Sequence, residues 1–417
     1  MTLTQSLDLH SSPIKSGVSS QLEAKVKAEW HPAKDILIST PGDELFHGML
    51  HYQSAFFQSP FDTSAATAEH QQFKTILRDE YGVQVHTVND LLLSNPTKLR
   101  TLAGEAMSYE IVGKAITPSL AEQLRLEHSE NLDHLSPEQL LRVILIRPAV
   151  VLRRNGSQNP ELEHYKINPA TNHFFQRDPQ ITTDKGVVLG RMKNRVRDYE
   201  TLLAEHVFEN LGITPLYRVN HHGTLEGGDY IPAGDYALIG QGLRTNEDAI
   251  QQLLDQKVFD FPEIAVVYDP FCQQDEMHLD TYFNLVAPDK GIIVDERIHS
   301  ENGNPHPDKL SRVTLYQRQE DGKYSQKTEK NELTFQEYLE HKGVHLIPLP
   351  KELQKRYGIN ILTMKENEVI AVENVSPDYC TYLKSHGVRV REVPMENLTK
   401  GYGGPHCMTQ VLFREEP

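Results

Sequence analysis

The chain has 417 residues, of which 38% are hydrophobic, so it is long enough to bury a sizeable core. Its formal net charge of −16 disfavours a nucleic-acid partner, because an acidic surface repels phosphate groups. No apolar run approaches the roughly 20 residues that span a bilayer, and the first residues lack the features of a signal peptide, so we predict a cytoplasmic protein without a membrane partner. Three cysteines without a C-x-x-C pair exclude a disulfide framework and disfavour structural zinc.

A strand–helix–strand pattern recurs five times along the chain. The predicted first strand, helix and second strand of each copy are 36–40, 69–81 and 82–85; 187–190, 198–211 and 213–219; 236–240, 246–256 and 264–268; 291–295, 334–342 and 343–344; and 369–372, 377–386 and 387–390. In four copies a glycine stands at or near the end of the helix, as expected of a helix stop. Since one such unit cannot bury its own apolar face, we predict an α/β fold in which five units form a five-fold pseudo-symmetric propeller. Ordinary α/β alternation without symmetry is the alternative.

Residues 89–165 interrupt this pattern. They have helical spacing with few strand signals, and Ser136, followed by a proline and an acid, is a good helix start. We therefore predict an inserted α-helical domain at 89–165, a catalytic propeller at 21–88 and 166–417, and a poorly ordered N-terminus at 1–20. The apolar faces of the inserted helices could serve a subunit interface, so a homo-oligomer is one option.

A second excursion, 314–328, has Asp321-Gly322 between alternating runs, which predicts a hairpin.

Reactive or charged residues gather beside turns in four clusters. They are NHFFQRDP (172–179), EGGD (226–229), HLD (278–280) and GYGGPHC (401–407). Cys407 follows three glycines in four positions, and glycines let a backbone approach a ligand closely, so Cys407 is the candidate nucleophile. For Cys272 and Cys380 a structural role is the better interpretation.

Charged partners for such a cysteine occur in the other three clusters. His278 and Asp280 lie two residues apart in a run that alternates like a strand, which would place both on one face. Histidine serves as an acid and a base near neutral pH, and Glu226 could hold it in its charged form. Asp178 precedes a proline and therefore belongs to an extended loop. Each cluster alone also fits an ordinary role: a sheet histidine, a solvated turn, or an ion pair between Asp178 and Arg177.

Together the four clusters suit the chemistry of a guanidinium group. This group is planar and cationic, so two carboxylates can clamp it bidentately. A thiolate can attack its central carbon, while a histidine protonates the departing ammonia and then activates water. We therefore predict a hydrolase that uses a thiol nucleophile and needs no metal or organic cofactor.

The motifs FFQRDP, LEGGD, MHLDT and GGPHCMTQ resemble the four site motifs of the arginine deiminases, in the same order. The resemblance runs from about residue 20 to the C-terminus and includes PGDE near residue 43 and EHQQF near residue 71. It implies the pentein fold and the hydrolysis of L-arginine to L-citrulline and ammonia through a covalent S-alkylthiouronium intermediate. The roles that it implies are Cys407 as nucleophile, His278 as acid and base, Asp178 and Asp280 as guanidinium clamps, Glu226 orienting His278, Phe175 packing on the guanidinium plane, and Asn172, Arg197 and Arg244 gripping the substrate carboxylate.

One position departs from the family pattern. Where many members have an arginine before the glycines of the cysteine loop, this chain has Tyr402, which offers one hydrogen bond and no charge. Substrate affinity and gating are therefore open at this position. Alone among the carboxylate-gripping candidates, Arg197 and Arg244 also fit solvated surface arginines.

Three rival functions stay open at the level of sequence. The first is a related guanidine-modifying enzyme, such as an amidinotransferase, an arginine dihydrolase, or a deiminase of agmatine or of a modified arginine. The second is an arginine sensor that binds without turnover, although a sensor has no use for a nucleophile. The third is a Cys/His metal site, which the absence of a second cysteine at ligand spacing disfavours.

Overall fold

The structure is a computed structural model that describes residues 22–113, 117–154, 160–298, 310–327 and 333–417. The predicted disorder of residues 1–20 concerns a segment outside these ranges. No helix in the described ranges is both long and apolar enough to cross a membrane.

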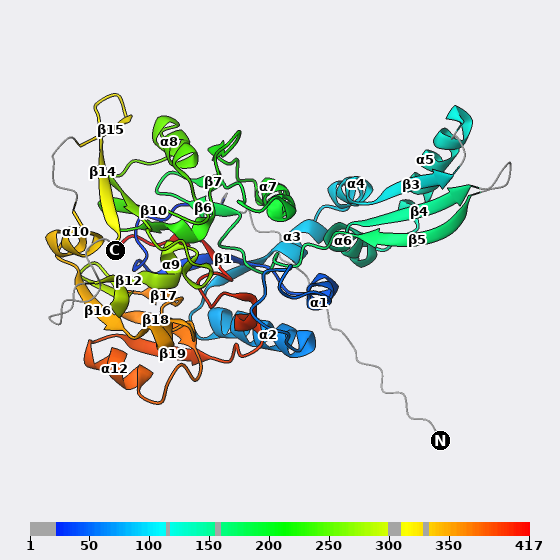
Figure 1. The fold of residues 1–417 in the computed structure, drawn as a ribbon. Coiled ribbons are helices and arrows are strands. Elements are labelled where there is room, and N and C mark those ends of the chain that lie inside the picture. The colour runs from blue at the N-terminus through cyan, green and yellow to red at the C-terminus, as the bar shows by residue number, and fades with distance from the viewer. Residues whose placement is uncertain (1–21, 114–116, 155–159, 299–309, 328–332) are drawn as a thin grey trace, which may run out of the picture.

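Five small sheets share one strand order. In each, a central strand pairs antiparallel with one neighbour and parallel with the other, and a helix connects the two parallel strands. In order of antiparallel strand, central strand, helix and parallel strand, they are β20 (Gln410–Arg414), β1 (Ala33–Ile38), α2 (Thr63–Asp79), β2 (Gln84–Thr87); β6 (Gln180–Thr182), β7 (Val187–Leu189), α7 (Asp198–Asn210), β8 (Tyr217–Arg218); β9 (Tyr230–Pro232), β10 (Tyr236–Gln241), α8 (Glu247–Asp255), β11 (Glu263–Tyr268); β12 (Phe283–Ala287), β13 (Lys290–Val294), α10 (Phe335–His341), β16 (His345–Leu349); and β17 (Leu362–Lys365), β18 (Glu368–Val372), α12 (Tyr379–Ser385), β19 (Arg389–Val393). Each strand–helix–strand unit predicted from the sequence is therefore present (Figure 1).

The central strands supply the core. Ile36, Leu238, Ile292 and Ile370, from four of the five units, are fully buried in one continuous apolar cluster. Val188 of the second unit packs in a neighbouring cluster. Burial of one such aliphatic side chain contributes about 1.5–3 kcal/mol, which explains why each central strand is a short run of β-branched and aliphatic residues.

A hairpin of β14 (Arg312–Arg318) and β15 (Tyr324–Gln326) extends the third sheet beyond β11. Its turn contains Asp321-Gly322, and Gly322 has a φ of +80°, a conformation that glycine adopts without steric cost. The hairpin predicted from the sequence is confirmed.

The insertion differs from its prediction. It contains α3 (Val88–Leu93), α4 (Pro96–Ala106), β3 (Ser108–Gly113), α5 (Pro118–Asp133), α6 (Pro137–Ile146), β4 (Pro148–Arg154) and β5 (Glu161–Ile167). Ser136 caps α6 with a full capping box, as expected. The prediction of a purely helical domain is wrong, however, because β3, β4 and β5 form a three-stranded sheet. Figure 1 shows this sheet and α5 extending to one side, away from the five sheets.

Three short helices complete the described elements. The first, α1 (Asp43–Met49), contacts α6 of the insertion. The others are α9 (Leu279–Tyr282) and α11 (Lys351–Gln354), and both lie within the fourth unit or its connection to the fifth.

Candidate active site

Four of the five units place polar site residues just before their antiparallel strands. Asp178 precedes β6, Glu226 precedes β9, His278 and Asp280 precede β12, and Cys407 precedes β20. The sequence interpretation of His278 and Asp280 as strand residues is wrong, since the strand begins only at residue 283 and the turn α9 comes first. A one-turn helix still brings both side chains to one place: a Cβ added to Gly228 would lie 2.7 Å from His278 Nδ1 and 2.9 Å from Asp280 Oδ1.

A narrow cavity of about 20 Å³ opens where these segments meet. A space of this size holds about one water molecule. Eight of the ten predicted site residues line it, namely Asn172, Phe175, Asp178, Arg197, Arg244, His278, Tyr402 and Cys407. Glu226 and Asp280 lie directly behind the lining and are fully buried. The fold therefore brings together residues that are up to 235 positions apart in the chain.

Cys407 is held by its backbone and surrounded by acids. Its N–H donates to Asn360 Oδ1 at 3.2 Å, and its thiol lies 3.7 Å from Asp280 Oδ2. Burial, followed by the negative charges of Asp280 and Asp178, raises the pKa of the thiol well above its usual value. Without a cation in the cavity, the sulfur is therefore a neutral thiol at neutral pH.

The cysteine loop requires glycine for a steric reason. A Cβ at Gly403 would lie 2.4 Å from the ring of Phe175 and 2.8 Å from Cys407 Cβ. The backbone thus approaches the aromatic ring and the sulfur more closely than any other residue would allow.

His278 is paired with Glu226. Its Nε2 lies 2.9 Å from Glu226 Oε2, and both side chains are buried. Burial disfavours the imidazolium, but the carboxylates of Asp178, Glu226 and Asp229 outweigh it and raise the pKa of His278 to about 9. His278 is therefore protonated at neutral pH and can act as an acid.

Two carboxylates present one free oxygen each. Asp178 Oδ2 accepts from Arg197 Nη1 at 2.9 Å, and Asp280 Oδ2 lies 2.6 Å from His406 Nδ1. The Oδ1 atoms of both residues are buried and have no hydrogen-bond partner among the described residues. Asp178 Oδ1 is 3.9 Å from His278 Nδ1, so the free oxygens lie beside the histidine. Buried acceptors without partners are costly, and a cationic donor in the cavity would satisfy them.

The two arginines of the site have different surroundings. Arg197 is buried and donates to both Glu200 and Asp178, so the interpretation as a solvated surface arginine is wrong. Arg244 is also buried, donates to Gln274 at 3.1 Å, and has no printed contact closer than 3.7 Å to an acid. Of the two, Arg244 therefore has the guanidinium more available to a ligand.

Asn172 and Tyr402 complete the lining. Asn172 donates to the carbonyl of Ala55 at 2.8 Å, and this bond fixes its side chain. Tyr402 has a φ of +70°, a left-handed conformation that is strained for a residue with a bulky side chain. Backbone strain of this kind is common where a loop forms a site.

Two residues of the site were missed in the sequence. His406 bonds the Asp280 clamp, and Asn360 accepts from the backbone of both Cys407 and Gly404. Asn360 stands just before β17, the position in the fifth unit that corresponds to the site residues of the other four. The repeat itself was therefore a usable signal for Asn360.

Behind His406 lies a buried charge network. Glu29 Oε1 is 3.8 Å from His406 Nε2, and Glu29 Oε2 accepts from Arg414 at 2.8 Å. Burial opposes ionisation of Glu29, but Arg414, His406 and Arg177 hold its pKa below the usual range. The N-terminal segment and the last strand thus support the clamp from behind.

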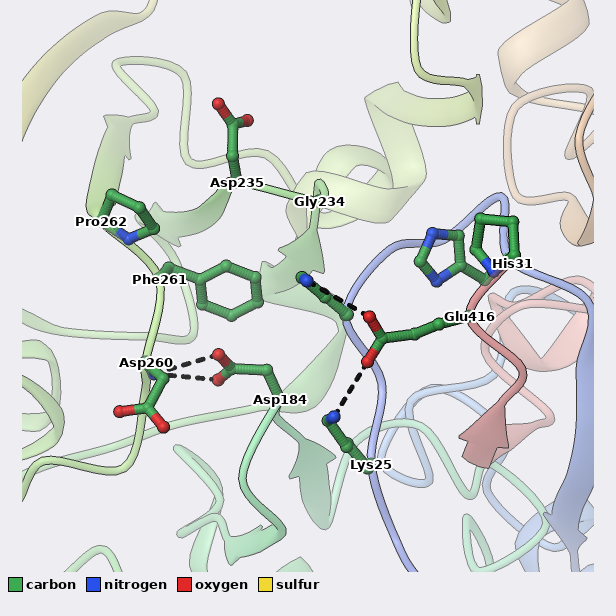
Figure 2. Close-up of a pocket in the computed structure, with 11 residues that line it drawn as sticks. Lys25, His31, Asp184, Gly234, Asp235, Asp260, Phe261, Pro262 and Glu416 are labelled. Carbon is green, nitrogen blue, oxygen red and sulfur yellow. Dashed lines mark hydrogen bonds and ion pairs between the residues drawn. The ribbon is translucent and has the colours of Figure 1, made fainter.

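A larger cavity, of about 610 Å³, lies between the N- and C-terminal segments of the described chain (Figure 2). Lys25 and Lys27 pair there with Glu416, and Asp184 accepts two hydrogen bonds from the backbone of Asp260. None of the predicted catalytic residues lines it. Size therefore misleads here, and the chemistry favours the smaller cavity around Cys407.

Metal binding lacks a suitable set of donors. Within the described ranges, no group of three or more His, Cys, Asp and Glu side chains is placed to hold a metal ion.

A family model described as arginine deiminase matches residues 53–414. The chain belongs to the arginine deiminase family. Arginine deiminases from Halobacterium salinarum and Limosilactobacillus fermentum are 23% and 26% identical to it, over 97% and 94% of the chain and 99% and 98% of those proteins. Family membership indicates a hydrolase that acts on C–N bonds in amidines.

Solved structures agree in fold. An amidinotransferase of saxitoxin biosynthesis from Microseira wollei superposes with a TM-score of 0.53 at 14% identity, over 95% of this chain and 98% of that one. A dimethylarginine dimethylaminohydrolase adduct superposes with a TM-score of 0.50 at 16% identity, over 91% and 99%. The mixed α/β architecture is therefore that of the pentein superfamily, to which both neighbours belong.

Proposed function

We propose that the chain is an arginine deiminase, which hydrolyses L-arginine to L-citrulline and ammonia. The free Oδ1 atoms of Asp178 and Asp280 carry the proposal, because they lie in one buried place with the Cys407 thiol and the protonated His278. A planar cation with several N–H donors is the ligand that satisfies two such oxygens at once.

The chemistry would begin when the substrate cation lowers the cost of a thiolate at Cys407. The thiolate adds to the guanidinium carbon, and His278 gives its proton to one terminal nitrogen, which leaves as ammonia. The product of this half-reaction is a cationic S-alkylthiouronium on the sulfur. Neutral His278 then takes a proton from water, the resulting hydroxide adds to the same carbon, and collapse expels the thiolate and releases citrulline. The surrounding carboxylates stabilise the positive charge throughout.

Recognition of the amino-acid end would come from residues farther from the sulfur. Arg244 and Asn172 line the cavity and would bind the substrate carboxylate, while Phe175 would pack on the guanidinium plane. Arg197 would act mainly by holding Asp178, since its donors are already shared with acids. Because the cavity holds about one water molecule, arginine can enter only if lining groups such as Tyr402 move.

We further propose that the five units are arranged around a pseudo-five-fold axis as a propeller, with residues 89–165 inserted between the first and second units. The common strand order supports this arrangement, and so does the recurrence of site residues before the antiparallel strands. A cytoplasmic location and the absence of a cofactor stay predictions from the sequence.

The decisive experiment is product analysis of the purified protein with L-arginine, agmatine and methylated arginines. We expect citrulline and ammonia in equal amounts from L-arginine, unaffected by a chelator. Cys407→Ala should abolish both products, whereas Cys272→Ala, which changes an exposed cysteine outside the cavity, should not. Ornithine or a transferred amidino group would instead identify a related guanidine-modifying enzyme, and binding without turnover would identify a sensor.

A further inference from the structure

The outer strand of the insertion is an uncovered sheet edge. Among the described strands, β5 pairs with β4 alone, and all seven of its residues are exposed. Leu162, Tyr165 and Ile167 retain 52%, 63% and 42% of their surface. An edge strand presents unpaired backbone N–H and C=O groups, and proteins normally cover such an edge or give it charges that repel other strands.

The register of the insertion sheet fixes which side chains share a face. Leu162 pairs with Leu152 and Tyr165 pairs with Val150, with one extra residue in β5 between these pairs. Because Val150 and Leu152 are two residues apart, Leu162 and Tyr165 lie on the same face of the sheet. Apolar groups therefore follow one face of the free edge.

The order of charges along β5 is complementary to itself. If a second copy of β5 is laid antiparallel on the free edge with the two-fold axis between residues 163 and 164, Glu161 faces Lys166 of the second copy. In the same register Leu162 faces Tyr165, and Glu163 faces His164. Each pairing occurs twice because of the symmetry, and each joins opposite charges, apolar groups or a hydrogen-bonding pair.

We infer that β5 is a dimerisation edge, where two copies of this chain join their three-stranded sheets into one continuous six-stranded sheet. The occupant is a second copy, because the complementarity is of the strand with itself. In Figure 1 the insertion extends away from the five sheets, which leaves the edge accessible to a second molecule of the same size. A seven-residue edge is small beside a standard interface of roughly 1,600 Å², so we expect dimerisation that depends on concentration.

A charge exchange tests both the edge and its register. In sedimentation velocity of the full chain over a wide concentration range, the unaltered protein should shift from monomer to dimer. Lys166→Glu should raise the dimer dissociation constant at least about tenfold, because it places two glutamates opposite each other at two symmetric positions. Adding Glu161→Lys should restore the dimer.

The exchange also separates dimerisation from effects within one chain. Lys166 pairs with Glu110 of its own sheet, and the double variant leaves Glu110 facing a glutamate. Rescue by Glu161→Lys therefore reports the contact between copies. A monomer at every concentration, a dimer that ignores Lys166→Glu, or a failure of the double variant to recover would each overturn the inference.

Crosslinking tests the register independently. In a Cys272→Ser background, Leu162→Cys combined with Tyr165→Cys should give a covalent dimer on a non-reducing gel, since facing strand residues lie within disulfide reach. Leu162→Cys alone should not, because its two copies would be offset by three residues, or about 10 Å. Equal crosslinking by the single variant, or none by the double variant, would contradict the proposed register. Deiminase activity should be unchanged in all of these variants.

Discussion

Glu226→Gln should shift the pH dependence of catalysis more than it alters the shape of the site. Glutamine is nearly isosteric with glutamate and can still accept a hydrogen bond from His278 Nε2, which now lies 2.9 Å from the carboxylate. The substitution removes the negative charge that helps to keep His278 protonated. A hydrogen bond to a charged group contributes about 1.5–3 kcal/mol, equivalent to roughly one to two pKa units, so the pKa of His278 should fall from about 9 to about 7–8.

The sign of the effect on rate follows from the proposed role of His278. Protonated His278 donates to the leaving ammonia, so kcat should fall as the pH rises through the pKa of this residue. In Glu226→Gln the alkaline limb of the kcat profile should therefore move to lower pH by one to two units. The measurement is citrulline formation at saturating L-arginine, from about pH 5.5 to 10, in both proteins.

A matched control separates this effect from a general loss of buried charge. Glu276 is also buried and pairs with Arg297 at 2.7 Å, but it has no printed contact with His278. Removing one partner of a buried pair costs about 3–5 kcal/mol, so Glu276→Gln and Glu226→Gln should lower the melting temperature to a similar degree. If both variants keep the alkaline limb of the unaltered protein, His278 does not supply the proton.

Three further predictions concern other parts of the molecule. Gly228→Ala should lower kcat/KM for arginine by about a hundredfold, because the added Cβ would lie 2.7 Å from His278 Nδ1, whereas Gly104→Ala in α4 has room and should be neutral or stabilising. Arg244→Gln should raise KM for L-arginine about 10- to 100-fold but change KM for agmatine, which lacks the carboxylate, far less; equal effects on both substrates would place Arg244 outside carboxylate recognition. Burial raises the pKa of Glu44 to about 7, so its ionisation opposes folding as the pH rises from about 4.5 to 7, and Glu44→Gln should gain up to about 3 kcal/mol over the unaltered protein across this range in denaturant titrations.

The repeating units could be predicted from the sequence because each carries its own local signals. The central strands are short aliphatic runs, and glycines follow several helices, as at Gly82, Gly212 and Gly387, where φ is positive. Such signals depend on neighbouring residues alone. They do not state how five units are placed around one another, which is why the propeller arrangement stays a proposal.

The insertion shows the opposite case. Helical spacing in α4, α5 and α6 is strong, but β3, β4 and β5 are short and joined by long connections, so their pairing depends on contacts between distant residues. The same limit explains the error at 278–280. Alternation there reflected the later strand β12, while Thr281 and His278 bond across a helical turn instead.

Site residues were found where a motif combined a reactive group with a turn, and were missed where the role is support. His406 adjoins Cys407 in the sequence, yet nothing local indicates that its ring reaches Asp280, 126 positions earlier. Glu29 and Arg414 lie at opposite ends of the described chain, and their ion pair exists only because the last strand returns to β1. Supporting residues of this kind are selected by tertiary contacts, to which a single sequence gives no access.

The anchoring of the two clamp carboxylates explains how an acidic cavity can remain ordered before a substrate binds. A free carboxylate in a closed space would rotate or take up a proton, and either change would weaken its grip on a cation. Here Arg197 and His406 each hold one oxygen of Asp178 and Asp280, which fixes the direction of the other oxygen. Part of each negative charge is thereby spent on the anchor, so the attraction for a guanidinium is smaller than two free acids would give. Loss of some affinity in return for fixed geometry favours catalysis, because only interactions that are better aligned in the transition state than in the bound substrate raise kcat.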